Sequence, residues 1–371
     1  MLPEPRIIVL ESDPEAQLAA LSNTPAVFVI HAGGREPYLA RTGMLRKRLL
    51  RLLGERGGPS RLLSLRSIAQ RVEYWPTASR LESSLLFYHL ARRYFPDTYL
   101  TVTKLRMPAY VKVVLSNPFP RAQVTNRIAG GGGYYFGPFR TRAGAEEFQN
   151  GMLDLFQLRR CQEDLEPSPA HPGCIYGEMN MCLRPCQQVV GPEEYASETR
   201  RVIEFLSTGG RSLLEPALAA RDRLSAELEF EEAGRQHERA ERIEALWKRR
   251  DGLAAGIDAL GGVAVTKSTD PDCVELWFVT GGSLHPARRF RVAPEDGAMR
   301  PMDARLRDLA AALAAPAHPS RDRQEHLALL ARWFYSSWRD GEWLSFENGQ
   351  PPYRKLVRAI SRHWNYQPPI N

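Results

Sequence analysis

The chain has 371 residues, 43% of them hydrophobic and 25% charged, which excludes a disordered chain, a coiled-coil rod and a collagen-like repeat. At about 150 residues per domain, this length predicts two or three domains. The net charge of +7 is modest, so its distribution matters more than its size. No run approaches the roughly 18 apolar residues of a membrane span, and we expect a cytoplasmic protein with no membrane contact.

The first 24 residues are predicted to be loosely structured, and a compact unit of strands and helices follows them. Leucines at helical spacing identify its first helix, and Ser79 and Pro96 mark the start and end of its second. The predicted order is strand, strand, helix, strand, helix, at residues 25–30, 38–40, 42–58 (with the final two glycines as its stop), 71–77 and 79–95.

The rest of the chain is predicted to add strands and then mostly helices, which together give an α+β fold. Four glycines at 130–133 form a turn between predicted strands. The expected strands lie at residues 110–114 and 122–125, with a β-hairpin at 274–292. The expected helices lie at residues 144–160, 192–206, 213–250 (as a helical hairpin), about 302–315 and about 321–338.

Basic residues are concentrated between Arg41 and Arg71, where nine of them accompany a single acid, Glu55. A local basic stripe is typical of a protein that binds a polyanion. We therefore predict a DNA-binding surface on the first helix, at Arg46, Lys47 and Arg51. The alternative is an ordinary solvated helix face.

The same unit carries the residue types that phosphodiester hydrolysis requires. That chemistry needs a divalent cation held by a carboxylate, a cationic clamp on the phosphate and a group that deprotonates water. The second helix has one acid in its first turn, Glu82. On composition alone, a lone Glu there more often complements the helix dipole.

The order of residues in this unit resembles the GIY-YIG nuclease domain of the UvrC excinuclease family. The resemblance is carried by Val27-Phe28, Tyr38-Leu39-Ala40-Arg41, Leu45 to Leu49 and Arg80-Leu81-Glu82. It implies a nuclease domain over residues 20–105 in which Tyr38, Arg41, Arg48 and Glu82 face one groove. Tyr38 would activate water, Arg48 would stabilise the phosphate, and Glu82 would bind Mg²⁺ or Mn²⁺.

Three positions depart from the pattern of that family: Phe28 replaces a tyrosine, Ala40 a glycine, and Tyr99 an asparagine. Two functions are therefore open. One is a metal-dependent endonuclease of nucleotide excision repair that makes the 3′-side incision in damaged DNA together with UvrB. The other is a DNA-binding and UvrB-interacting protein without nuclease activity.

Four of the five cysteines lie close together in the sequence, at Cys161, Cys174, Cys182 and Cys186. Clustered thiols in a cytosolic protein favour a four-thiolate site, and the single close pair favours an iron–sulfur cluster over structural zinc. Unrelated buried cysteines are the alternative, and Cys273 is expected in the core.

The cysteine region also resembles the UvrC family, more specifically than the nuclease unit does. The matching segments, in order, are Tyr135 to Phe139, Leu158 to Cys161, Cys174-Ile-Tyr, Cys182-Leu-Arg-Pro-Cys186 and Pro192 to Tyr195. The resemblance implies a β extension and cysteine-rich module over residues 106–206 that holds a 4Fe–4S cluster.

Residues 207–250 resemble the UVR motif, the helical hairpin by which UvrC proteins pair with UvrB. Its apolar contacts would be Phe230, Ala233, Ile243 and Leu246. On the charge pattern alone, the solvated edge of a helical bundle is the better interpretation.

The resemblance covers about residues 20–250, and residues 251–371 are expected to form a small α+β region of unknown role. This region is too short for both an RNase H-like nuclease and a helix-hairpin-helix pair, so a short homologue is implied. Its aromatic residues, Trp333 to Tyr335, Trp338 and Trp343, are expected to pack a small domain, with base stacking as the alternative.

Overall fold

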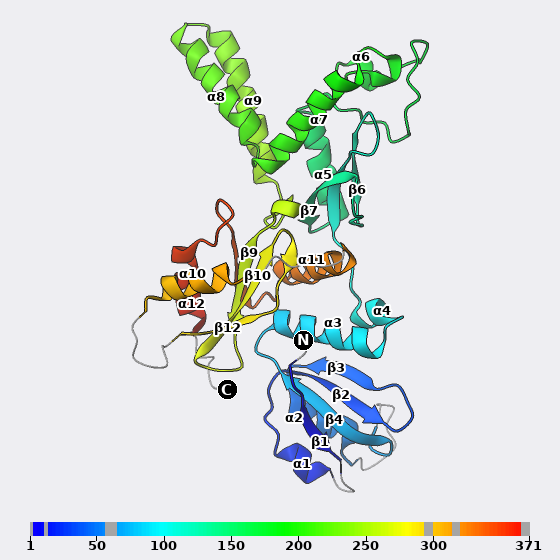
Figure 1. The fold of residues 1–371 in the computed structure, drawn as a ribbon, viewed down its shortest axis with the longest axis vertical. Coiled ribbons are helices and arrows are strands. Elements are labelled where there is room, and N and C mark those ends of the chain that lie inside the picture. The colour runs from blue at the N-terminus through cyan, green and yellow to red at the C-terminus, as the bar shows by residue number, and fades with distance from the viewer. Residues whose placement is uncertain (1–2, 11–13, 56–64, 293–299, 314–319, 365–371) are drawn as a thin grey trace.

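The computed structural model describes residues 3–10, 14–55, 65–292, 300–313 and 320–364 (Figure 1). Its three antiparallel sheets and surrounding helices confirm the predicted α+β class. In Figure 1 the N-terminal sheet lies at the bottom and the C-terminal sheet beside the middle of the molecule, while the middle region and a long helical hairpin extend at the top. No helix in the described ranges is both long and apolar enough to cross a membrane.

The N-terminal sheet has the strand order β1-β4-β2-β3. Its elements are β1 (Arg6–Val9), α1 (Glu15–Ala19), β2 (Ala26–Ala32), β3 (Tyr38–Thr42), α2 (Leu45–Leu53), β4 (Ala69–Pro76), α3 (Arg80–Tyr94) and α4 (Tyr99–Thr103). The prediction of a loose N-terminus was wrong, because β1 pairs with β4 and Leu18 of α1 is fully buried. Trp75 also donates its indole N–H to the carbonyl of Pro3.

Helices cover both faces of this sheet. Along β2, Phe28 and Ile30 pack in one cluster with the leucines of α1 and α2. Val27 and Val29, at the alternating positions, pack against α3 in another. Because side chains alternate along a strand, α2 and α3 lie on opposite faces.

The middle region contains a second sheet in the order β6-β5-β7-β8. Its elements are β5 (Ala109–Val114), β6 (Arg121–Thr125), β7 (Gly133–Phe139), α5 (Arg142–Leu153), α6 (Ile175–Glu178), α7 (Pro192–Ser207) and β8 (Ala255–Gly256). The helix predicted to reach residue 160 ends at Leu153. The following segment turns inward instead, and the backbone N–H of Arg159 donates to the hydroxyl of Tyr195 at 2.8 Å.

The predicted helical hairpin is confirmed as α8 (Arg211–Ala226) and α9 (Phe230–Lys248). Leu228 makes the turn between them with a φ of 65°. The C-terminal end of α9 packs against α5, and the other end, at the turn, projects from the molecule (Figure 1).

The C-terminal sheet has the order β11-β10-β9-β13, with β12 also paired to β10. Its region contains β9 (Gly262–Lys267), β10 (Cys273–Thr280), β11 (Ser283–Leu284), β12 (Arg288–Arg291), α10 (Met302–Ala311), α11 (Ser320–Phe334), β13 (Gly341–Ser345) and α12 (Tyr353–Trp364). The predicted β-hairpin is confirmed by the pairing of β10 and β12, whereas β9 and β13 were not predicted. Trp333 is fully buried, which confirms the packing role expected for it.

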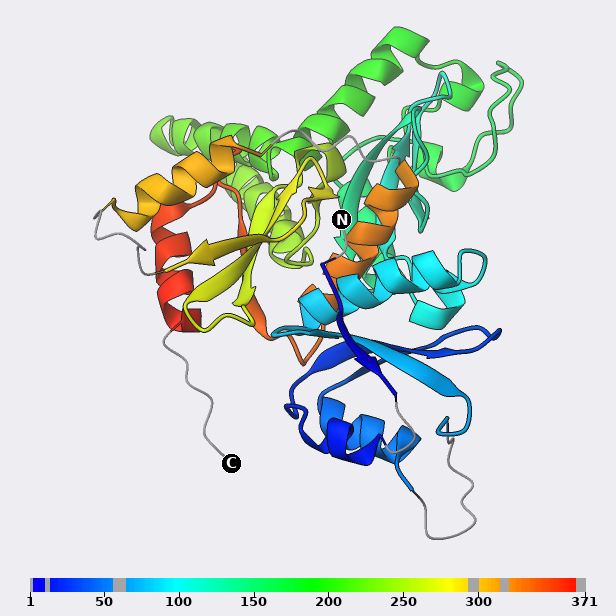
Figure 2. The same ribbon diagram turned by 60° about the horizontal axis from the view of Figure 1, so that its bottom comes forward.

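Helix α11 joins the C-terminal region to the N-terminal domain, and Figure 2 shows it beside α3. The buried carboxylate of Glu325 on α11 accepts hydrogen bonds from Tyr88 at 2.5 Å and from Tyr99 at 2.7 Å. Tyr99, which stands where the GIY-YIG family has an asparagine, thus forms part of this junction.

Candidate functional site

Tyr38 and Arg48 form a pair on the α2 face of the N-terminal sheet. Arg48 donates from Nη2 to the Tyr38 hydroxyl at 2.9 Å. Tyr38 packs in the α2 cluster, with its ring centroid 6.2 Å from that of Phe28. The structure therefore brings together two of the four predicted nuclease residues.

Arg41 lies on the opposite face of the sheet, against α3. It donates from Nη1 to the Ser84 hydroxyl at 3.0 Å, and its guanidinium carbon lies 5.7 Å from the centre of the Phe87 ring. Burial, followed by the charges of Arg332 and Arg80, lowers the pKa of Arg41. On α3, Arg41 thus contacts the Ser84 hydroxyl and the aromatic ring of Phe87.

Glu82 caps the helix that carries it. Its carboxylate accepts from the Ala78 N–H at 2.7 Å, while its own N–H donates to the Ser79 hydroxyl at 3.1 Å. This reciprocal arrangement is closely related to the capping box. Burial and then the charge of Glu275 raise the pKa of Glu82 to about 7, despite the opposing hydrogen bond from Ala78.

The four predicted nuclease residues lie on both sides of the N-terminal sheet, with Tyr38 and Arg48 on the α2 side, Arg41 against α3 and Glu82 on α3 itself. Glu82 and Ser84 are two residues apart on α3, about 200° around the helix axis, so Glu82 and Arg41 flank different sides of α3. Tyr38 and Arg48 lie on the other side of the sheet from α3, the side that α2 covers. Across the described ranges, no group of three or more His, Cys, Asp or Glu side chains is arranged to hold a metal ion.

We expect Glu82→Gln to stabilise the protein more at higher pH. The folded chain raises the pKa of Glu82 from 4.5 to about 7, so the folded state binds this proton more tightly than the unfolded state. Wild-type stability therefore falls as the pH rises through this window. Gln avoids that loss and still offers an oxygen to the Ala78 N–H.

Urea unfolding at about pH 5 and about pH 8 measures this effect, which corresponds to about 1.4 kcal/mol for each pKa unit. The advantage of Glu82→Gln over wild type should be larger at the higher pH. Glu36→Gln, in the exposed turn between β2 and β3, is the matched control and should show no such growth. An equal advantage at both pH values would contradict the burial argument.

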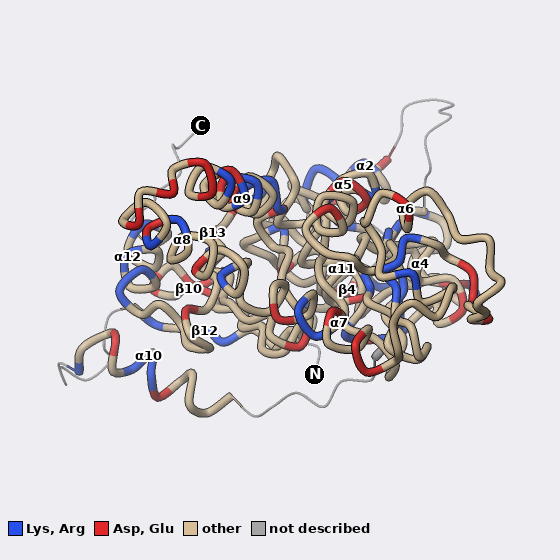
Figure 3. Tube along the Cα trace, turned by 90° about the horizontal axis from the view of Figure 1, so that it is seen from above, with Lys and Arg blue, Asp and Glu red and all other residues tan. Residues whose placement is uncertain are grey.

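The predicted DNA-binding side chains Arg46, Lys47 and Arg51 are exposed on α2. Part of the neighbouring positive charge is neutralised, because Arg66 pairs with Glu55 at 3.2 Å. Arg56 and Arg61 lie outside the described residues. Figure 3 shows both signs of charge interspersed over the molecule, as along α9.

The four clustered cysteines lie within electrostatic reach of one another. Burial, together with the charges of Cys161, Cys174 and Cys186, raises the pKa of the Cys182 thiol to about 11. The Arg184 N–H also approaches the Cys182 sulfur at 3.4 Å. Cys273 is buried elsewhere, in β10, as expected.

Arg159 is a functional candidate that the sequence did not identify. Its side chain is 1% exposed and donates to the carbonyls of Phe119 at 2.8 Å and Glu163 at 2.7 Å. It also approaches the Cys161 sulfur at 3.4 Å, and its buried Nη2 has no hydrogen-bond partner. A buried cation requires a counter-charge, and four metal-bound thiolates would supply one. Across the described ranges, however, the four thiols are not arranged as a metal site, so a thiolate-bound metal or cluster stays a prediction.

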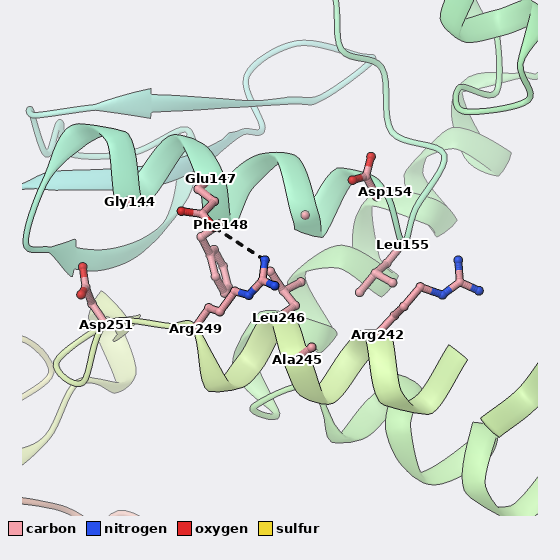
Figure 4. A pocket seen from close by; sticks show the side chains of 11 residues that line it. Gly144, Glu147, Phe148, Asp154, Leu155, Arg242, Ala245, Leu246, Arg249 and Asp251 are labelled. Atoms are coloured by element: carbon pink, nitrogen blue, oxygen red, sulfur yellow. Dashed lines mark ion pairs between the residues drawn. The ribbon is translucent and has the colours of Figure 1, made fainter. Parts of the chain in front are cut away.

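The predicted partner-binding residues have different surroundings. Ile243 is 1% exposed and Leu246 packs with it in the core of the middle region, so both hold α9 to α5. Figure 4 shows Leu246 beside Phe148 in the groove of about 290 Å³ between these helices, where Glu147 pairs with Arg249 at 3.7 Å.

Only the turn end of the hairpin offers an apolar surface to a partner. Phe230 is 65% exposed and Leu228, which the sequence argument missed, is 71% exposed, whereas Ala233 is buried. Two large exposed apolar side chains at the end of a projecting hairpin are typical of an interaction site.

Comparison with known proteins finds similarity to excinucleases of the UvrC type. Residues 109–205 match the family described as "UvrC/Cho excinuclease, middle domain". The UvrABC system protein C of Moorella thermoacetica is 25% identical over 289 residues, covering 78% of this chain and 47% of that protein. The corresponding protein of Xanthomonas oryzae pv. oryzae is 28% identical over 275 residues, covering 73% and 44%. No solved structure matches the chain.

The class of protein that this region is similar to is that of the excinucleases. The chain is similar to UvrC-family proteins, and it spans about half the length of the curated relatives it matches. The match over 289 residues is longer than residues 1–250, so the similarity continues beyond the hairpin, further than the sequence patterns indicated.

Proposed function

We propose that this chain acts in nucleotide excision repair as a DNA-binding protein that does not itself cut DNA. The observation that carries this proposal is the position of Glu82. Its carboxylate caps α3 and lies on the other side of this helix from Arg41. Burial raises the pKa of this carboxyl group to about 7, so a divalent cation would compete with a proton for it near neutral pH.

The second candidate is metal-dependent incision on the 3′ side of the lesion, and the Tyr38–Arg48 hydrogen bond favours it. An arginine that holds a tyrosine hydroxyl could prepare this oxygen to take a proton from water while the guanidinium contacts a phosphate. In this candidate Glu82 would hold Mg²⁺ or Mn²⁺, which would supply Lewis-acid stabilisation when bound.

We further propose that Cys161, Cys174, Cys182 and Cys186 hold a 4Fe–4S cluster, with structural zinc as the alternative. Arg159 is buried beside Cys161 and forms no ion pair within the described residues, which supports a site with negative thiolates. Either group would fix the irregular segment between α5 and α7 by tying its distant parts together.

The proposed partners are damaged duplex DNA and a UvrB-like protein, in the cytoplasm. Arg46, Lys47 and Arg51 would contact DNA phosphates, since their side chains are exposed on one helix. Phe230, with Leu228, would contact the UvrB-like protein through the exposed end of the hairpin.

A test compares binding and incision on a nicked, lesion-bearing duplex, with Mg²⁺ or Mn²⁺ and with UvrA and UvrB. We expect wild type and Glu82→Ala to bind the duplex equally and to produce no incision. A UvrC protein of known cutting activity is the positive control. Incision by wild type that Glu82→Ala abolishes without loss of binding would establish the second candidate instead.

A further inference from the structure

A cavity of about 430 Å³ lies where three parts of the chain meet. The segment after α4 contributes Lys104 and Arg106, the end of β7 contributes Arg140, and α11 contributes Arg332. Met107 and Tyr335 are among the less polar residues that complete its wall. The cavity is separate from the Tyr38–Arg48 pair and from the cysteines.

The charge of this cavity is entirely positive. Its lining includes four cationic side chains and no acid, and within the described ranges none of the four takes part in an ion pair. Arg332 is held in place by a hydrogen bond from Nη1 to the Thr103 carbonyl at 3.1 Å. Asp251 approaches Arg140, but it accepts the backbone N–H of that residue at 2.7 Å. Like charges gathered around a hollow repel one another, so an anion there would relieve the repulsion.

The positive surface continues beyond the cavity towards the N-terminal domain. The charges of Arg332 and of Arg80 each act on Arg41, so Arg41 lies within electrostatic range of both. Arg80 is held over the ring of Trp338, 5.2 Å from its centre. Cations from β3, α3, α11 and the segment after α4 thus form an extended group, which suits a chain of phosphates better than a single small anion.

We propose that the cavity lined by Lys104, Arg106, Arg140 and Arg332 binds backbone phosphates of a DNA strand that continues past Arg41 and Arg80. The proposal rests on the proposed DNA-binding function and gives it a second contact surface, on the side of the N-terminal sheet opposite α2. Arginine presents a planar fork of donors that matches phosphate oxygens, and the less polar wall can contact sugars. A DNA strand bound there would contact three parts of the chain: the segment after α4, the end of β7 and α11.

The test is the salt dependence of duplex binding by Arg106→Gln and by Arg106→Gln/Arg332→Gln. Each lost phosphate contact should reduce the slope of log K against log salt by about 0.9, so the double variant should lose about 1.8. The control, Arg200→Gln/Arg354→Gln, removes the same charge from exposed positions on α7 and α12 and should leave the slope unchanged. Arg106 is exposed, so the single variant keeps the test valid even if the double variant unfolds.

The outcomes separate this inference from the proposed function. If wild type binds duplex DNA and the cavity variants keep its full salt slope, the cavity proposal fails while the proposed function stands. If wild type binds no DNA, both fail. Titration with inorganic phosphate and with ATP tests the other sources of phosphate. Saturable binding of either ligand that Arg106→Gln abolishes, with an unchanged DNA slope, would overturn the strand assignment in favour of a free anion.

Discussion

Replacing Arg159 by methionine is expected to deplete the chain of the metal that we propose for its four clustered cysteines. The guanidinium is the buried cation next to Cys161, and its loss removes the positive charge that favours thiolate over thiol. It also leaves the carbonyls of Phe119 and Glu163 without their donor, at about 1–3 kcal/mol for each buried group left unsatisfied. Methionine fills a similar volume, so the cavity left behind is small.

The measurement is the iron, sulfide and zinc content of anaerobically purified protein, together with its visible absorbance. Wild type should be brown, whereas Arg159→Met should contain much less metal and Arg159→Lys an intermediate amount. Arg160→Met is the matched control, because Arg160 is the neighbouring residue and pairs with Asp154 at 2.7 Å. One zinc ion in a colourless wild type would identify the alternative site.

Unfolding with and without the metal separates a role at the metal site from a purely structural one. In the metal-free protein Arg159 lacks its counter-charge, so the substitution should cost less stability there than in the loaded protein. We expect the loss of stability in the loaded protein to exceed that in the metal-free protein by at least about 1.4 kcal/mol, which is tenfold in an equilibrium constant. If the substitution lowers the free energy of unfolding equally in both forms, Arg159 serves packing alone. If wild type is purified without metal, the proposed metal site itself is wrong.

Local patterns were sufficient to predict much of the fold. The elements from 25 to 95 and the two hairpins each have their own signals, such as leucine spacing, a capping Ser79 and a stop at Pro96. Strand β1 was missed because RIIV is short and needs β4 to complete it, and its charged surroundings suggested a loose end. The end of α5 was missed because the residues that follow favour a helix, whereas burial of Arg159 turns the chain inward.

The site was harder to predict than the fold, because site residues depend on long-range placement. Tyr38 and Arg41 are close in sequence but point to opposite faces of the sheet, so Tyr38 packs beside α2 and Arg41 against α3. The cap role of Glu82, in contrast, was visible in the sequence as an acid in the first turn. The cavity lined by Arg106 and Arg332 was invisible, since more than 200 residues separate the two.

Replacing Phe230 at the apolar tip of the hairpin should weaken pairing with the UvrB-like protein that we propose as a partner. Phe230 is 65% exposed although it is a large aromatic residue, and Leu228 beside it is 71% exposed. Aromatic residues at the centre of an interface commonly contribute at least about 2 kcal/mol, so Phe230→Ser should weaken association by at least about 30-fold. Both side chains face solvent in the isolated chain, so the substitution should leave the free energy of unfolding almost unchanged.

Titration calorimetry with purified UvrB measures the association, and Val189→Ser is the matched control. Val189 is 53% exposed and lies away from the hairpin, so its replacement should leave the affinity unchanged. Ile243→Ala tests the opposite case, because Ile243 is 1% exposed and packs with the core of the middle region. It should lower the free energy of unfolding by about 2–5 kcal/mol, since it deletes a buried side chain. If Phe230→Ser binds UvrB as tightly as wild type does, the binding surface does not depend on Phe230 and lies elsewhere on the hairpin. Ile243 and Leu246 would not form that surface, because they pack α9 against α5.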